Sequence, residues 1–209
     1  MPTGSELNRG VSVVVPTIGR LSLWAAIESA LACESPALQV EVLVCADLPD
    51  GALDEEWELK VGDRSGRAQL LYSGGKQGAC VARNIGARAA RMNMITFLDD
   101  DDLFLSNKLE TQVSLLEAAG SLKQIVAGRA RYHMLNGRVS DVPRCVYSGG
   151  QIGDYLFVRR KLSPDRNLIP TPTWLMYTEF ALSVGWRDGL ARHQDWDFLI
   201  LSLIHISEP

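Results

Sequence analysis

Four consecutive aspartates, Asp99 to Asp102, directly follow the apolar run at 94–98 and carry the strongest chemical signal in the chain. Carboxylates this close repel one another and raise each other's pKa unless a cation lies among them. Mg²⁺ and Mn²⁺ are held by one or two carboxylates together with phosphate oxygens of a substrate. The cluster therefore predicts a divalent metal whose other ligands are phosphates. The alternative is a solvated acidic turn or an acidic helix N-terminus, which the helix dipole would favour.

Strands and helices alternate along the first half of the chain. The strand runs are short, almost wholly apolar and rich in β-branched residues, which is typical of strands buried on both faces. Between them, apolar residues recur at helical spacing, as in Leu23, Ala26 and Ile27. This alternation predicts an α/β fold with a mostly parallel sheet and helices on both faces. The expected strands are residues 11–16, 40–45, 68–72 and 94–98, and the expected helices are residues 23–31, 78–91 and 106–119.

Polar residues follow three of these strands where each one ends. Pro16 and Thr17 close the first strand, Asp47 follows the second, and the aspartate cluster follows the fourth. In open parallel sheets, ligands bind beyond the carboxyl ends of the strands. We therefore expect these residues to share one crevice.

The second half is less regular. Strands are expected within residues 124–134, 138–147 and 173–177, with Asn136-Gly137 as a hairpin turn between the first two. Residues 160–172 are rich in charge and proline and predict a loop, and a helix is expected to start at Asp195. The change of character near residue 123 predicts one domain over 1–209 with two halves, about 10–122 and about 123–209, the second ending in an interrupted helix.

The composition is that of an ordinary globular protein, with 46% hydrophobic and 22% charged residues. A net charge of −4 argues against a nucleic-acid partner. The four cysteines contain no C-x-x-C pair, which predicts reduced thiols. We see no signal peptide and no run of about 20 apolar residues, and therefore expect a soluble, cytoplasmic protein without a transmembrane segment.

Five short motifs are spread along the chain: Val-Val-Val-Pro-Thr at 13–17, Val-Cys-Ala-Asp at 44–47, Ala-Arg-Asn-Ile-Gly at 82–86, Phe-Leu-Asp-Asp-Asp-Asp at 97–102 and His-Gln-Asp-Trp-Asp-Phe at 193–198. In this order they resemble the inverting glycosyltransferases of family 2, which have the GT-A fold. The sequence departs from the family pattern at Ala46, where the first of two aspartates is expected, and at Gln194, where glutamate is commoner. The resemblance implies a nucleotide-sugar-binding first half and an acceptor-binding second half.

The resemblance also implies roles in donor binding. Pro16 and Thr17 would form the corner of the donor site, and Asp47 would accept a hydrogen bond from the base, the N3–H of uracil. From the residues alone, Asp47 is equally compatible with a turn or helix cap. Arg83 would reach the diphosphate or pair with a strand-end aspartate. Asp99 would face the ribose or the metal.

In the metal motif, the resemblance implies that Asp99 and Asp101 hold Mn²⁺ or Mg²⁺ against the diphosphate. We expect Asp102 to orient loop or acceptor groups and Asp100 to be solvated. The metal would act as a Lewis acid that offsets charge on the departing diphosphate.

Inversion at the anomeric carbon requires a base that takes the proton of the acceptor hydroxyl. The resemblance places this base at Asp195, whose alternative is a helix N-terminal carboxylate that accepts hydrogen bonds from free N–H groups. Trp174 and Trp186 would stack on an acceptor sugar or belong to the core.

These residues predict a metal-dependent hexosyltransferase that uses a nucleotide-diphospho-sugar donor, in polysaccharide or glycan biosynthesis. The acceptor would be a glycan, a lipid-linked molecule or a small molecule. A lipid-linked acceptor would be compatible with peripheral membrane association, although the sequence shows no amphipathic basic helix. Ala46, Gln194 and the interrupted last helix leave open a non-catalytic nucleotide-sugar-binding or interaction domain. A nucleotidyltransferase is a third alternative, disfavoured because residues 16–20 contain a single glycine.

Overall fold

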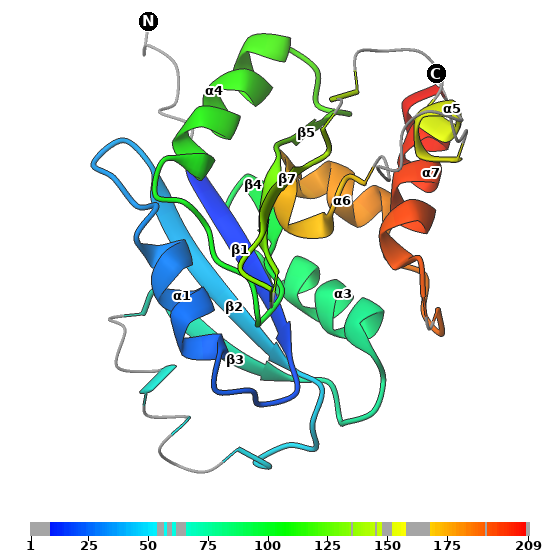
Figure 1. The fold of residues 1–209 in the computed structure, drawn as a ribbon. Helices are drawn as coiled ribbons and strands as arrows, with labels where there is room; N and C mark the ends of the chain where they lie inside the picture. Colours follow the sequence, from blue (N-terminus) through cyan, green and yellow to red (C-terminus); the bar gives the residue numbers. More distant parts are fainter. Residues whose placement is uncertain are drawn as a thin grey trace, which may run out of the picture.

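A six-stranded sheet forms the centre of the molecule, with the strand order β3-β2-β1-β4-β8-β5 (Figure 1). The computed structural model describes residues 9–53, 57, 60–61, 66–134, 136–144, 146–147, 152–157, 168–190 and 192–207. The four strands of the first half run parallel, whereas β8 is antiparallel to β4 and β5 is antiparallel to β8. The strands are β1 (Gly10–Thr17), β2 (Gln39–Ala46), β3 (Ala68–Tyr72), β4 (Met94–Phe97), β5 (Ile125–Ala127) and β8 (Trp174–Tyr177).

Helices cover both faces of this sheet. Apolar residues of α1 and α4 pack on the face that includes Val13, and those of α3, α6 and α7 pack on the face that includes Val14. This arrangement confirms the predicted α/β fold, and each strand and helix predicted in the first half lies within two residues of its predicted bounds. The helical residues 57 and 60–61 have no predicted counterpart. The helices are α1 (Leu23–Leu31), α3 (Ala79–Ala89), α4 (Lys108–Ala119), α5 (Ile152–Phe157), α6 (Thr178–Val184) and α7 (Gln194–Ser207).

The second half differs from the sequence-based expectation. The single strand expected within residues 124–134 is broken: β5 joins the main sheet, whereas β6 (Ala130–His133) pairs only with β7 (Val139–Val142). The turn between β6 and β7 contains Asn136 and Gly137, as predicted, and Gly137 has the positive φ of 76° that favours glycine. Helices α5 and α6 were not predicted, because six or seven residues are too few to display a helical period. Most of the loop expected at 160–172 lies outside the described residues.

Two expectations from composition can be compared with the structure. Cys33, Cys45 and Cys80 are buried free thiols, as predicted, and burial raises the pKa of Cys45 to about 12. Cys145 lies outside the described residues. Over the part of the chain that the structure describes, no helix has the length and apolar character needed to cross a membrane.

Helix α3 lies unusually close to the sheet because of Gly86. A Cβ atom placed on Gly86 would lie 2.4 Å from Cγ1 of Val14 and 2.8 Å from Sγ of Cys45. Neither neighbour can move easily, since both are fully buried in the core. The missing side chain therefore sets the distance between α3 and strands β1 and β2.

We expect Gly86→Ala to destabilise the fold by about 1–3 kcal/mol, the usual cost of inserting an atom into a packed core. The change can be measured as a shift of the urea denaturation midpoint. Gly128→Ala is the matched control, because the nearest atoms to its added Cβ are 3.9 Å away. Equal midpoints for the two variants would contradict the packing argument.

Candidate functional site

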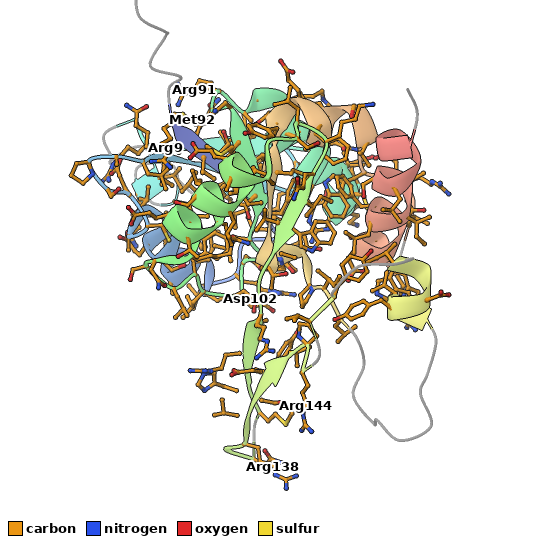
Figure 2. The ribbon with its side chains drawn as sticks, turned by 90° about the horizontal axis from the view of Figure 1, so that it is seen from above. Arg9, Arg91, Met92, Asp102, Arg138 and Arg144 are labelled. Carbon is orange, nitrogen blue, oxygen red and sulfur yellow. The ribbon has the colours of Figure 1, made fainter. Side chains whose placement is uncertain are left out.

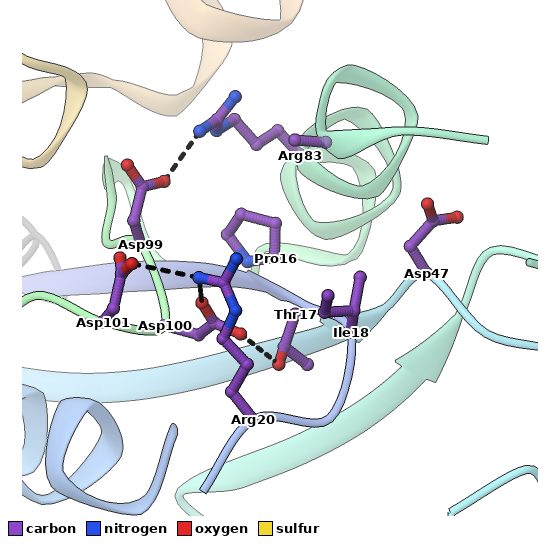
Figure 3. Close-up of a pocket in the computed structure, with 10 residues that line it drawn as sticks. Pro16, Thr17, Ile18, Arg20, Asp47, Arg83, Asp99, Asp100 and Asp101 are labelled. Atoms are coloured by element: carbon purple, nitrogen blue, oxygen red, sulfur yellow. Dashed lines mark hydrogen bonds and ion pairs between the residues drawn. The ribbon is translucent and has the colours of Figure 1, made fainter. Parts of the chain in front are cut away.

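A cavity of about 280 Å³ opens at the carboxyl ends of β1, β2 and β4 (Figure 3). The structure thus contains the crevice expected from the strand ends, and six residues singled out in the sequence line it: Pro16, Thr17, Asp47, Arg83, Asp99 and Asp101. Ile18, Arg20, Ala79 and Asp100 complete the lining. Asp195, the expected base, is not among the lining residues.

The Arg83 side chain connects three elements at one side of this cavity. Its guanidinium donates a hydrogen bond of 2.7 Å to Oδ1 of Asp99, after β4, and one of 2.8 Å to Oε1 of Gln194, at the start of α7. The side chain is only 7% exposed, and its Cζ atom lies 4.7 Å from the ring centre of Trp186. Its Nε atom is buried and has no hydrogen-bond partner among the residues that the structure describes. Of the two roles expected for Arg83, the ion pair with a strand-end aspartate is present.

The Asp100 carboxylate is buried, contrary to the expectation that it is solvated. It accepts a hydrogen bond of 2.6 Å from the Thr17 hydroxyl and one of 3.0 Å from Nη1 of Arg20. The same Arg20 nitrogen lies 3.0 Å from Oδ2 of Asp101 (Figure 3). The chain turns after β4 so that Asp100 points toward the end of β1, which no property of the acidic run itself could indicate. Sequence reasoning also missed Arg20, whose only signal was its place in the loop after the first strand.

The acidic run is a loop and not a helix N-terminus, because α4 begins only at Lys108. The Asp101 side chain is 61% exposed, and Asp102 is also exposed. Loss of hydration around the carboxyl group, followed by the charges of Asp99 and Asp101, nevertheless raises the pKa of Asp102 to about 6. The repulsion expected among these carboxylates therefore contributes to the raised pKa of Asp102, after the loss of hydration.

Asp47 caps the turn that immediately precedes helix α3. The backbone N–H groups of Gln77 and Gly78 donate hydrogen bonds of 2.8 and 2.9 Å to its two carboxylate oxygens, and the Ser73 hydroxyl donates a third. Partial burial tends to raise the pKa of Asp47, but these hydrogen bonds outweigh it and hold the pKa below its usual value. The capping role is thus present, while the contact with a base stays a prediction.

Asn84 attaches the loop before α7 to helix α3. Its side chain accepts a hydrogen bond of 2.9 Å from the N–H of Trp186 and donates one of 2.7 Å to the carbonyl oxygen of the same residue. Trp186 stacks on Trp174, with ring centres 5.8 Å apart, and both are buried beside Phe97 and Phe198. The two tryptophans therefore belong to the core and are not platforms for an acceptor.

Asp195 lies in the first turn of α7, where its Oδ1 accepts a hydrogen bond of 3.0 Å from the N–H of Trp196. Partial burial raises the pKa of Tyr132, and the negative charges of Asp102 and Asp195 raise it further. Strand β6 therefore brings a phenol close to both carboxylates. Sequence reasoning did not single out Tyr132, because an aromatic residue in a strand carries no chemical signal of its own.

Residues 12–176 match the family model described as Glycosyl transferase family 2. An uncharacterized glycosyltransferase of Rickettsia conorii is 28% identical over 144 residues, which are 66% of this chain and 22% of that protein. The Escherichia coli protein named UDP-Glc:alpha-D-GlcNAc-diphosphoundecaprenol beta-1,3-glucosyltransferase WfgD is 33% identical over 108 residues, 51% of this chain and 40% of that protein. The matched region thus spans well under two thirds of these relatives.

Among solved structures, TarS 1-349 of S. aureus in complex with UDP-GlcNAc is similar, with a TM-score of 0.60 and 18% identity. The similarity covers 92% of this chain and 52% of that chain. At this identity the comparison concerns the fold alone, and it confirms the expected GT-A architecture.

The raised pKa of Asp102 predicts a pH-dependent stability in metal-free protein. Between about pH 4 and pH 6, the folded state holds a proton on Asp102 that the unfolded chain, with the usual pKa of 3.8, has released. Stability therefore falls as pH rises through this window. We expect Asp102→Asn to be more stable than the parent at about pH 7.5, and the difference to shrink toward pH 4.

Denaturation with urea in EDTA at several pH values would measure this difference. Asp154→Asn, a change at an exposed residue of α5, is the control and should leave the pH profile unaltered. A stability difference between Asp102→Asn and the parent that stays constant from about pH 4 to pH 7.5 would exclude titration of Asp102 as the cause.

Proposed function

The chain belongs to glycosyl transferase family 2, and on this premise we propose that it moves a hexosyl group from a UDP-linked sugar to an acceptor hydroxyl, with inversion at the anomeric carbon. The cavity at the strand ends carries this proposal, because carboxylates of Asp99 and Asp101 and the guanidinium of Arg83 line the same space (Figure 3). A nucleotide diphosphate needs such a pairing of cationic and metal-binding groups. Membership of this family argues against the nucleotidyltransferase alternative.

The residues at the cavity suit a hard divalent cation such as Mn²⁺ or Mg²⁺. Arg83 bonds Oδ1 of Asp99, and Arg20 bonds Oδ2 of Asp101. The other oxygen of each carboxylate, Oδ2 of Asp99 and Oδ1 of Asp101, is left for a metal. Within the described ranges, no group of three or more His, Cys, Asp or Glu side chains is arranged as a metal site. Two carboxylates with remaining ligands from the donor's phosphates fit this observation. The bound cation would offset negative charge on the departing diphosphate.

The contacts of Arg20 in the metal-free protein also support Asp101 as a metal ligand. Its guanidinium lies between Asp100 and Asp101 and offsets part of their mutual repulsion. The Arg20 side chain is 51% exposed, so it can move aside at small cost, whereas the Asp100 side chain is 7% exposed and keeps its bond from Thr17. Asp101 is thus the carboxylate of this pair that is accessible to a metal.

We assign the general base to Asp195. Inversion requires a base on the face of the sugar opposite the leaving group. Arg83 supports this placement, because its bonds to Gln194 and Asp99 hold the start of α7 beside the acidic loop. The Asp195 carboxylate would accept the proton of the acceptor hydroxyl as the oxygen attacks the anomeric carbon.

The names of two relatives indicate which class of acceptor this chain would use. Two Escherichia coli relatives are named as glucosyltransferases that act on a diphosphoundecaprenol-linked sugar. We accordingly propose a lipid-linked acceptor and a role in glycan assembly.

Calorimetric titration of UDP, with and without Mn²⁺, tests the donor site. We expect Mn²⁺-dependent binding of UDP, with GDP and AMP as base controls, and a loss of at least about tenfold in affinity for Asp101→Asn, because it removes a charged ligand. Asp154→Asn, far from the cavity lining, should bind like the parent. Unchanged Mn²⁺-dependent UDP affinity in Asp101→Asn would overturn the metal assignment.

Asp195→Asn tests the base. We expect UDP binding to be retained and transfer from UDP-glucose to a diphospholipid-linked N-acetylglucosamine to fall by about 10²–10⁴-fold, the usual contribution of a general base. Asp197→Asn is the matched control, since Asp197 lies on the same helix and pairs with Arg187 at 3.4 Å. Loss of UDP binding in Asp195→Asn would mean that this carboxylate is structural. UDP binding without transfer by the parent would favour the non-catalytic binding domain.

A further inference from the structure

The β6–β7 hairpin extends away from the main sheet. Figure 2 shows it projecting from the rest of the molecule, with Arg138 at its far end and Asp102 near its base. Arg9, Arg91 and Met92 lie at the opposite end of the molecule in the same view. The hairpin is therefore a thin, two-stranded extension on the side of the acidic loop.

The hairpin carries a positive charge that the chain as a whole lacks. Residues 128–147, which comprise the hairpin and the short segments on either side of it, contain four arginines and a single acidic residue, whereas the whole chain has a net charge of −4. That acidic residue, Asp141, pairs with Arg131 at 2.7 Å. Arg138 has no carboxylate partner within the described part of the chain. An anionic surface would therefore repel most of the molecule and attract this segment.

The same segment exposes large apolar side chains. Tyr132, Met134 and Val139 are 43%, 49% and 55% exposed. Met134 and Arg138 lie opposite each other at the turn, joined by a backbone hydrogen bond of 2.8 Å, so that an apolar and a cationic residue are neighbours there. Further exposed apolar side chains are Val146 and Tyr147 beyond the hairpin, and Ile18, Leu21, Leu103 and Leu105 on the two loops that flank the cavity.

We infer that the β6–β7 hairpin binds the surface of an anionic lipid bilayer. Apolar and aromatic side chains beside arginines are the combination that partitions into the headgroup region of such a bilayer. In this orientation Asp102, at the hairpin base, and the adjacent acidic loop would face the membrane. The inference rests on the proposed function in one respect: a lipid-linked acceptor would then present its sugar at the side where the cavity opens.

Co-sedimentation with lipid vesicles tests this inference. The vesicles contain phosphatidylcholine alone or with about one quarter phosphatidylglycerol, at low and high salt, because screening separates charge-driven from apolar binding. We expect binding to the anionic vesicles that weakens with salt. The double variant Arg138→Ala/Val139→Ser should bind at least about fivefold less, the contribution of one arginine near an anionic surface, and Arg138→Lys should retain binding.

The matched control is Arg88→Ala/Leu122→Ser, which removes an exposed arginine near the end of α3 and an exposed leucine after α4. It should bind vesicles like the parent. Retained Mn²⁺-dependent UDP binding in both double variants shows that each is folded.

Equal binding to neutral and anionic vesicles, or equal binding by the parent and Arg138→Ala/Val139→Ser, would overturn the inference. The inference would also be overturned if sedimentation velocity showed that the parent is a dimer and that Arg138→Ala/Val139→Ser is a monomer. The hairpin surface would then be covered by a second copy of the chain. If the parent binds UDP but no vesicles, only the inference that the hairpin binds a membrane is refuted, and the proposed function is unaffected. Vesicle binding without UDP binding would instead refute the proposed function.

Discussion

The buried guanidinium of Arg83 is the interaction on which the arrangement of the site depends. A cation that is taken out of water costs several kcal/mol unless charged and polar partners surround it. Arg83 finds them on separate elements: Asp99 after β4, Gln194 at the start of α7, and the face of Trp186 in the intervening loop. Because all three contacts must be made at once, α3, the acidic loop and α7 hold one relative position. The two halves of the chain are thereby held together beside the cavity, in addition to the pairing of β8 with β4.

The first half of the fold and the location of the cavity could be predicted from the sequence, because both follow from short-range patterns. Strands buried on both faces are continuous apolar runs, and helices with one buried face show a period of 3.6 residues. Once the parallel order is known, the ends of β1, β2 and β4 must meet at one edge. The sequence therefore predicts one crevice that contains Thr17, Asp47 and Asp99, and the structure puts all three on the wall of one cavity.

What could not be predicted depends on contacts between distant residues. Whether Asp100 or Asp101 turns inward is decided by the backbone after β4 and by Thr17, which lies 83 residues earlier. The break between β5 and β6 likewise depends on a distant strand, since β8 pairs with β5 whereas β6 pairs with β7. Asp47 was compatible with two roles because a capping carboxylate and a ligand-binding carboxylate have the same sequence context. The capping contacts themselves depend on Gln77 and Gly78, which lie about 30 residues further along the chain.

The residue at position 194 also sets the local charge balance. The Gln194 amide accepts a hydrogen bond from Arg83 without neutralising it, and its own N–H donates to the Leu190 carbonyl oxygen at 2.7 Å. A glutamate, the commoner residue in the related motif, would preserve the first bond but add one unit of negative charge beside a cavity already lined by four aspartates. With glutamine, Asp99 is the only anion among the described residues that Arg83 contacts directly, so more of the arginine's electrostatic field extends into the cavity. A substitution that suggested degeneration in the sequence thus makes the cavity less repulsive to an anion.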